Sequence, residues 1–193
     1  MTLTPELTQV FTEARTQNGY LDRDVTDEQL RALYELVKFG PTAVNSGPAR
    51  FQFVRSAEAK ARLVRCMAPA NQPKVAQAPV SVVIGMDLDF PDTLPQLFPH
   101  VDARAWFAGN DALIEESAFR NSSLQGGYLI LAARALGLGC GPMSGFDADQ
   151  VDAAFWSGTR VRTNFICTLG HGDPAKVYPR LPRLAFEQAC QLV

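Results

Sequence analysis

The nonapeptide Gly139-Cys140-Gly141-Pro142-Met143-Ser144-Gly145-Phe146-Asp147 lies between two predicted helices and separates them. Its three glycines and one proline predict an irregular backbone whose N–H and C=O groups stay free. Such a loop is suited to binding a flat ring with polar edges. An ordinary connection between helices would contain the same residues, so the rest of the chain has to decide between the two interpretations.

A long helix is expected before this nonapeptide and a shorter one after it. Asn110 caps the long helix, which runs as one piece or as two in succession to Leu136. Asp147 and Gln150 form an N-cap and capping-box pair for the helix that follows. Paired glycines at 126–127 cost the long helix about 1 kcal/mol each against alanine. They indicate close packing against a backbone or a flat ligand, or a seam between two copies of the chain.

Capping and periodicity place the other elements. Three further helices begin after N-cap residues at Thr4, Thr26 and Ser56. Strands are expected over residues 51–55, 79–86 and 162–169. The segment 87–109 is irregular and rich in proline and aromatic residues, which predicts a lid or an arm. Since no repeat or linker interrupts the pattern, residues 1–193 are predicted to form a single domain.

Composition excludes several functional classes. The 193 residues are 47% hydrophobic and 20% charged with a net charge of -2, so a concentrated basic face for nucleic acid is not expected. Two histidines and four scattered cysteines predict no metal site and no disulfide framework. The N-terminal residues lack a signal peptide, and no window has the roughly 18 apolar residues of a membrane span. The expectation is a cytoplasmic protein without a membrane partner.

Common catalytic motifs are also missing from the sequence. It contains no glycine-rich dinucleotide or phosphate loop and no nucleophile elbow. Cys140 could act as a nucleophile, but no histidine or other base lies near it in the sequence, so a packed thiol is the preferred interpretation.

Polar, irregular stretches instead suggest a flavin site. They lie at residues 15–18, 41–48, 71–74 and 142–146, and a basic tail follows at 170–183. Together they offer cations for a phosphate, amides for ring heteroatoms and small residues for a flat face. These are the requirements of a site for flavin mononucleotide, FMN.

At these same residues the chain resembles the flavin-dependent nitroreductase family over nearly its whole length. The motifs are Arg15-Thr16, Pro41-Thr42-Ala43-Val44-Asn45-Ser46-Gly47-Pro48, Gly137-Leu138-Gly139, Pro142-Met143-Ser144-Gly145-Phe146 and the basic C-terminal arm. Residues 98–107, 119–123 and 178–183 are similar to the malonic semialdehyde reductase branch, the 3-hydroxypropionate dehydrogenases of pyrimidine degradation. Two departures stand out: the usual double-basic pair is Ala14-Arg15, and the usual Gln-Pro-Trp is Gly47-Pro48-Ala49.

The resemblance implies an α+β, nitroreductase-like fold with a central, mainly antiparallel sheet surrounded by helices. It also implies a homodimer with a long interface helix and two FMN sites between the subunits. The implied cofactor-binding residues near the phosphate and ribityl chain are Arg15, Thr16, Asn18, Lys176 and Arg180. Those implied near the ring are Pro41, Thr42, Ala43 and Asn45 from the neighbouring subunit, and Asn71, Lys74, Pro142, Met143, Ser144 and Gly145.

The expected activity is an NADPH- or NADH-dependent oxidoreductase with no catalytic side chain, because the flavin N5 carries the hydride. The expected substrate is a small aldehyde, malonic semialdehyde, which becomes 3-hydroxypropionate. Arg104 and Arg120 are candidates for its carboxylate, because a guanidinium pairs well with that group. The alternatives are a broad nitroreductase or quinone reductase, a flavin-binding protein without turnover, and a cofactor-free interaction domain.

Overall fold

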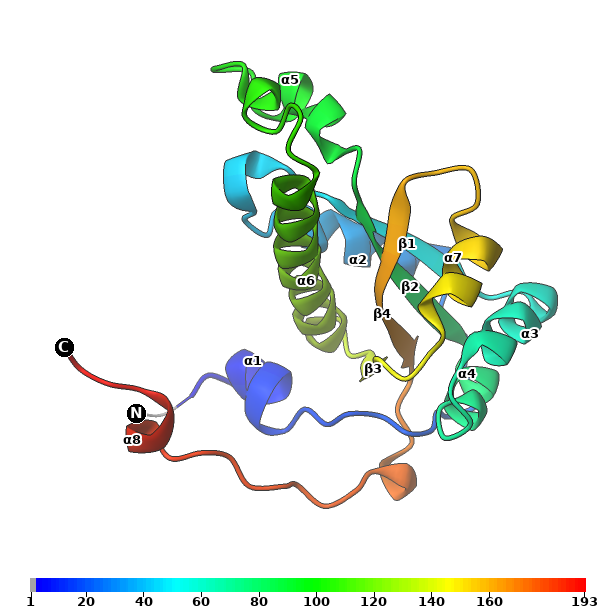
Figure 1. Ribbon diagram of the computed structural model, residues 1–193. Helices are drawn as coiled ribbons and strands as arrows, with labels where there is room; N and C mark the ends of the chain where they lie inside the picture. The colour runs from blue at the N-terminus through cyan, green and yellow to red at the C-terminus, as the bar shows by residue number, and fades with distance from the viewer. Residues whose placement is uncertain (1–2) are drawn as a thin grey trace.

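A computed structural model describes residues 3–193, and its centre is a four-stranded antiparallel sheet (Figure 1). The strand order is β1 (Ala49–Val54), β2 (Val80–Asp87), β4 (Val161–Gly170) and β3 (Gly139–Met143). Strand β2 is buried along nearly its whole length because it pairs on both sides and is covered on both faces. The predicted antiparallel sheet surrounded by helices is confirmed.

Helices cover both faces of this sheet. On one face α2 (Asp27–Val37) and α6 (Asp111–Ala135) pack against Val82, Ile84 and Leu169. On the other face α3 (Ala57–Cys66), α4 (Gln72–Gln77) and α7 (Ala148–Phe155) pack against Val83 and Ile166. Alternation along the strands sends successive side chains to opposite faces, so each strand serves two hydrophobic cores.

The predicted helix starts are confirmed by side-chain caps. The Thr26 hydroxyl accepts a hydrogen bond from the backbone N–H of Gln29, whose side chain accepts one in return. Asn110 caps α6, and Asp147 caps α7. Each cap satisfies a donor that the first helical turn would otherwise leave free.

The nonapeptide at 139–147 is only partly the irregular loop that the sequence predicts. Helix α6 ends at Ala135, and Gly137 follows with a left-handed φ of 76°. Residues Gly139–Met143 then form β3, an edge strand, which can accommodate Pro142 because an edge strand pairs on one side only. The irregular part is confined to residues 144–146.

The first helix also differs from its prediction. Helix α1 (Pro5–Leu7) continues as one π-helical turn (Thr8–Thr12) and stops there, several residues before the expected end near Gln17. The reason is tertiary pairing: Thr16 forms a β-bridge with Cys140, and the backbone N–H of Gln17 donates to the Cys140 carbonyl at 2.8 Å. An extended backbone at 15–18 therefore lies beside β3.

The segment 87–109 forms an arm with three short helices, η3 (Phe90–Thr93), α5 (Leu94–Leu97) and η4 (Ala103–Trp106). Sequence alone suggested irregular chain here. The arm has a small core of its own, in which the Phe90 and Phe107 rings meet edge to face at 5.0 Å. Figure 1 shows the arm at the N-terminal end of α6, far from β3.

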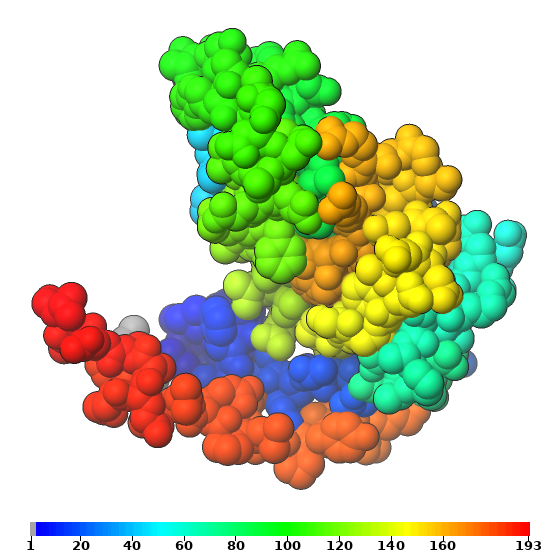
Figure 2. Space-filling view, viewed as in Figure 1, coloured from blue at the N-terminus to red at the C-terminus, as the bar shows by residue number. Residues whose placement is uncertain are grey.

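Three short elements complete the described chain: η2 (Ala43–Asn45), η5 (Pro174–Lys176) and α8 (Phe186–Ala189). The C-terminal tail leaves the body and passes the N-terminal segment (Figures 1 and 2). Within residues 3–193, none of the helices has the length and apolarity needed to cross a lipid bilayer.

The two glycines of α6 have different surroundings, which gives a matched stability test. A Cβ at Gly126 would overlap the Phe165 ring, whereas a Cβ at Gly127 would meet no described atom within 4 Å. Gly126→Ala should therefore lower the free energy of unfolding by about 1–3 kcal/mol through overpacking. Gly127→Ala should not lower the free energy of unfolding, because alanine has a higher helix propensity than glycine. Chemical denaturation of both variants checks this, and equal effects would contradict the packing at Gly126.

Candidate functional site

The predicted site residues form two groups in the structure. The first group surrounds β3 and contains residues from four segments: Arg15, Thr16, Asn18, Asn71, Lys74, Pro142, Met143, Ser144, Gly145, Lys176 and Arg180. The second group lies on the 41–48 loop, which packs on α6 and the arm. The structure brings each group together but keeps the two groups apart within one chain.

A buried hydrogen-bond network holds β3 in the first group. The Tyr20 hydroxyl donates to Thr168 Oγ1 at 2.7 Å, and the Thr168 hydroxyl donates to the Gly141 carbonyl at 3.3 Å. Burial raises the pKa of the Tyr20 phenol, which keeps it a neutral donor. Only glycine fits at 141, because a Cβ there would overlap Thr168 and approach the Gln17 carbonyl to 2.8 Å. Strand β3 and the segment 15–18 therefore lie in close contact.

Removing the Tyr20 hydroxyl tests this network. Tyr20→Phe should lower the free energy of unfolding by about 1–2 kcal/mol, because Thr168 loses its partner in a buried site. Tyr34→Phe is a matched control, since the Tyr34 side chain is 48% exposed. Denaturation curves of the two variants give the comparison, and an unchanged stability of Tyr20→Phe would argue against the network.

Two guanidinium groups join the N-terminal segment to the tail. Arg15 Nη2 donates to the Tyr178 carbonyl, and Arg180 Nη2 donates to the Thr12 and Ala14 carbonyls at 2.6 and 3.0 Å. A guanidinium has five N–H donors, and among the described residues these bonds use only the Nη2 group of each. Both arginines thus keep donors and positive charge available for an anion.

The loop after β3 is fixed by residues before α4. Asn71 Nδ2 donates to the Gly145 carbonyl at 3.1 Å, and the backbone N–H of Ala68 donates to the same oxygen at 3.0 Å. Pro142, Met143 and Gly145 are half-buried and Ser144 is exposed, so this rim is accessible.

The first group also contains two lysines, Lys74 and Lys176, whose surroundings differ. Lys74 is half-buried on α4, which begins at the same Asn71. Lys176 packs its alkyl chain over Gly19 and reaches Asp173 at 3.8 Å. Its side chain is 49% exposed, so the Asp173 pair is weak and leaves the ammonium free to move.

The second group is exposed on alternate residues of its loop. Pro41, Ala43 and Asn45 are exposed, and the residues between them face inward. The Tyr128 hydroxyl donates to the Pro41 carbonyl at 2.9 Å, and the backbone N–H of Ala43 donates to Asn121 Oδ1 at 2.8 Å. Helix α6 therefore holds this loop through the side chains of Asn121 and Tyr128.

Helix α6 also sets the distance between the two groups. Asn121 and Tyr128 contact the second group, whereas Arg134 contacts the N-terminal segment through Val10 and Gln9. Arg134 is thirteen residues from Asn121 and six from Tyr128, which at 1.5 Å per residue is roughly 20 and 9 Å along the helix. The two groups therefore contact different parts of α6.

The substrate candidates Arg104 and Arg120 are paired with carboxylates of the chain itself. Arg104 reaches Asp92 at 2.8 Å, and Arg120 contacts Glu116 one helical turn away. All four side chains are about 60% exposed, so both pairs are weak and exchangeable. Neither arginine lies in the first group.

Several residues near the site were missed by sequence reasoning. Gln17 and Arg134 line a cavity of about 360 Å³ behind the segment 15–18, together with Gly139 and Gly172. Gln17 Oε1 and Arg134 Nε are buried there without a hydrogen-bond partner among the described residues. Polar residues with no spacing rule carry little sequence signal, so only the three-dimensional contacts identify them.

Buried Cys140 is shielded on all sides. It is 0% exposed, and its thiol contacts the Ile130 carbonyl at 3.7 Å. Contact with this thiol, and burial, hold the pKa of Cys167 well above its ordinary value. Both thiols are fully buried, which supports a packing role.

Comparisons with known proteins agree on one family. A profile described as "Nitroreductase family" matches residues 12–171. A Ralstonia pickettii protein, HadB, with the provisional name NADH dehydrogenase/NAD(P)H nitroreductase, is 60% identical over 195 residues and matches all of both chains. A similarly named protein of Ralstonia nicotianae is 59% identical and covers 100% of this chain and 99% of its own.

Solved structures show the same fold. A nitroreductase-type protein of Bacillus subtilis superimposes with a TM-score of 0.89 at 20% identity, covering 97% of this chain and 99% of its own. One from Exiguobacterium sibiricum, solved in complex with FMN, gives a TM-score of 0.86 at 22% identity and covers 100% and 99%.

Proposed function

The chain belongs to the nitroreductase family, and from this premise we propose that it is an FMN-dependent NAD(P)H oxidoreductase. The observation that carries the proposal is the first group around β3, where two guanidinium groups and an accessible rim of small residues come together. The FMN in the Exiguobacterium sibiricum structure supports the choice of cofactor.

The residues of the first group fit the chemistry of FMN. Arg15 and Arg180 keep donors for a phosphate, and the exposed hydroxyl of Thr16 adds another. Lys74 and Asn71 would supply a cation and an amide at the pyrimidine edge, where positive charge stabilises an anionic ring. Pro142, Met143, Ser144 and Gly145 would form the opposite wall, and Asn18 would meet the ribityl chain.

Completion of this site requires a second copy of the chain. The second group contacts a different part of α6 from the first within one chain, so Pro41, Thr42, Ala43 and Asn45 would reach the ring from the partner subunit. A groove of about 610 Å³ along α6, lined by Phe119, Leu124, Tyr128 and Leu131, supports such a dimer. An apolar groove of this kind is typical of an interface.

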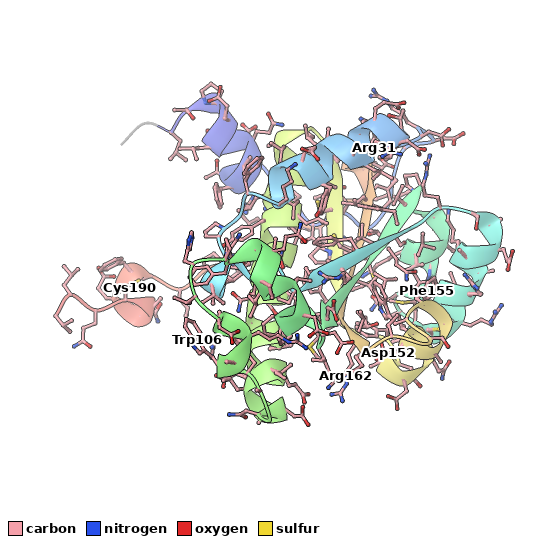
Figure 3. The ribbon with its side chains drawn as sticks, turned by 90° about the horizontal axis from the view of Figure 1, so that it is seen from above. Arg31, Trp106, Asp152, Phe155, Arg162 and Cys190 are labelled. Atoms are coloured by element: carbon pink, nitrogen blue, oxygen red, sulfur yellow. The ribbon has the colours of Figure 1, made fainter. Side chains whose placement is uncertain are left out.

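The exposed tail supports the same assembly. Tyr178, Leu181, Leu184 and Phe186 are 70%, 74%, 69% and 55% exposed. Figure 3 shows Cys190, directly after α8, standing clear of the body. An apolar tail that extends from its own subunit is well placed to cover a partner.

In the proposed reaction, bound FMN takes a hydride from NADPH or NADH and passes it to the substrate. The protein's part is to hold the ring between the two groups, to exclude water with the arm and to place charge at the pyrimidine edge. No side chain has to form a covalent bond with the substrate.

The proposed substrate is a small aldehyde, malonic semialdehyde, reduced to 3-hydroxypropionate. Arg104 or Arg120 would then release its present carboxylate partner and bind that of the substrate. The same ion pairs favour a second candidate, a broad nitroreductase or quinone reductase, because neither arginine is held ready for a carboxylate. The names of the relatives at about 60% identity agree with this second candidate.

Absorbance of the purified protein tests the proposed function. We expect a yellow protein whose flavin band bleaches when NADPH or NADH is added without oxygen. A coloured protein that does not bleach would be a flavin binder without turnover, and a colourless one that FMN does not stabilise would overturn the proposal. Ratios of kcat/KM for malonic semialdehyde, menadione and a nitroaromatic compound then separate the two substrate classes.

A further inference from the structure

We propose that Asn121 of α6 is a positioning residue that holds the 41–48 loop in the conformation needed to bind FMN. The inference rests on the proposed function, and it assigns a role to a residue that the resemblance at residues 119–123 leaves without one. Asn121 is 2% exposed, so it acts on the cofactor only through the loop that it supports.

The loop has a strained backbone. Val44 and Asn45 have left-handed φ angles of 49° and 51°, and Gly47 follows at 48°. A β-branched residue in this region is a genuine outlier, since its side chain crowds the backbone. Such conformations persist only where the surrounding structure fixes them, and they cluster at functional sites.

Several contacts fix this loop, and they come from different parts of the chain. The Thr42 hydroxyl accepts from the backbone N–H of Gly47 at 3.1 Å, and Asn45 Nδ2 donates to the Leu97 carbonyl at 2.9 Å. Arg50 Nη1 donates to the Gly47 carbonyl at 3.0 Å. These contacts bind the loop to itself, to the arm and to β1.

Asn121 differs from these contacts because it holds the strained turn to the long helix. Its Oδ1 accepts from the N–H of Ala43, directly before Val44, and its Nδ2 donates to the Ser117 carbonyl at 2.8 Å. Both ends of the amide are therefore used, which fixes its orientation. Without it, a buried N–H loses its partner and the turn can relax to an unstrained conformation.

A matched control lies one helical turn further along α6. Gln125 is also buried, and its Oε1 accepts from the backbone N–H of Ala49 at 2.8 Å. Ala49 begins β1, beyond the strained turn. Loss of either amide removes a bond from a backbone N–H to a buried side-chain oxygen, and loss of Asn121 also removes its bond to the Ser117 carbonyl. Of the two, only Asn121 bonds to the residue before Val44.

The experiment compares Asn121→Leu with Gln125→Met in full-length protein stripped of FMN. Melting temperatures of the apo-proteins measure the structural cost, and fluorescence titration measures the FMN dissociation constant. We expect similar losses of melting temperature, but an FMN dissociation constant raised roughly tenfold for Asn121→Leu alone.

Two results would overturn the inference. One is an FMN dissociation constant for Asn121→Leu equal to that of wild type. The other is an FMN dissociation constant that rises as much in Gln125→Met as in Asn121→Leu. If Asn121→Leu does not fold, Asn121→Ser leaves room for a water and must show the same weakened binding. A wild-type protein that does not bind FMN overturns the proposed function itself, and this result is visible before any variant is compared.

Discussion

Replacing Arg15 and Arg180 together by glutamine is expected to weaken FMN binding roughly 100-fold or more. Each guanidinium would make a charge-assisted hydrogen bond to the phosphate, and such bonds contribute about 1.5–3 kcal/mol each. Glutamine keeps an amide donor without the charge, but its side chain is shorter than the arginines that now contact the carbonyls of Thr12, Ala14 and Tyr178. A phosphate-free ligand therefore has to separate the missing charge from a released tail.

Riboflavin, which lacks the phosphate, makes this experiment specific. The wild-type protein should prefer FMN strongly over riboflavin, and the double variant should bind the two with similar affinity. Arg183→Gln is the matched control, because Arg183 Nη1 donates only to the nearby Leu181 and Pro182 carbonyls. If the double variant kept the full preference for FMN, the phosphate would lie elsewhere.

Gly127→Glu is the second substitution with a large expected effect. Gly127 lines the apolar groove on α6, and a side chain there would meet no described atom of its own chain. The monomer should therefore fold normally. In the proposed dimer the carboxylate would be buried without a partner, which costs several kcal/mol and should weaken dimerisation by at least roughly 100-fold.

Because the two groups of site residues would meet across the proposed dimer, this variant should also lose FMN. Sedimentation velocity and the flavin absorbance of the same sample measure both effects. Ala61→Glu adds an identical charge to an exposed position of α3 and should change neither quantity. A Gly127→Glu protein that is dimeric and yellow would show that this face of α6 is not the interface.

Local chemistry was enough to predict the helix starts and the buried strands. The caps at Thr26, Asn110 and Asp147 each depend on residues within one helical turn, so they can be recognised in the sequence without knowledge of the tertiary structure. Strand β2 could be recognised because Val80, Val82, Val83 and Ile84 are apolar and β-branched.

Long-range pairing explains where the sequence was misleading. Gly141 and Pro142 are typical of a loop, yet β4 offers an open edge and makes them a strand. Strand β3 in turn pairs with Thr16 through Cys140, which ends the first helix early. No local pattern contains this information, because Thr16 and Cys140 are more than a hundred residues apart and α7 separates β3 from β4.

The candidate site was predictable as a set of segments but not as an arrangement. Resemblance to a family supplied the residues, whereas the separation of the two groups along α6 came only from the structure. Gln17 and Tyr20 carry no motif, and Asn121 lies in the 119–123 stretch without an assigned role, since a buried polar residue has no fixed spacing from its partner.

Sedimentation velocity recorded at the flavin absorbance band tests the central claim most directly, which is that two copies of the chain hold FMN between them. The account predicts that all flavin sediments with a species of twice the chain mass, and that anaerobic NADPH or NADH bleaches the band of that same species. Flavin that sediments with a single chain, or protein dimers that carry no flavin when FMN is supplied, would contradict it.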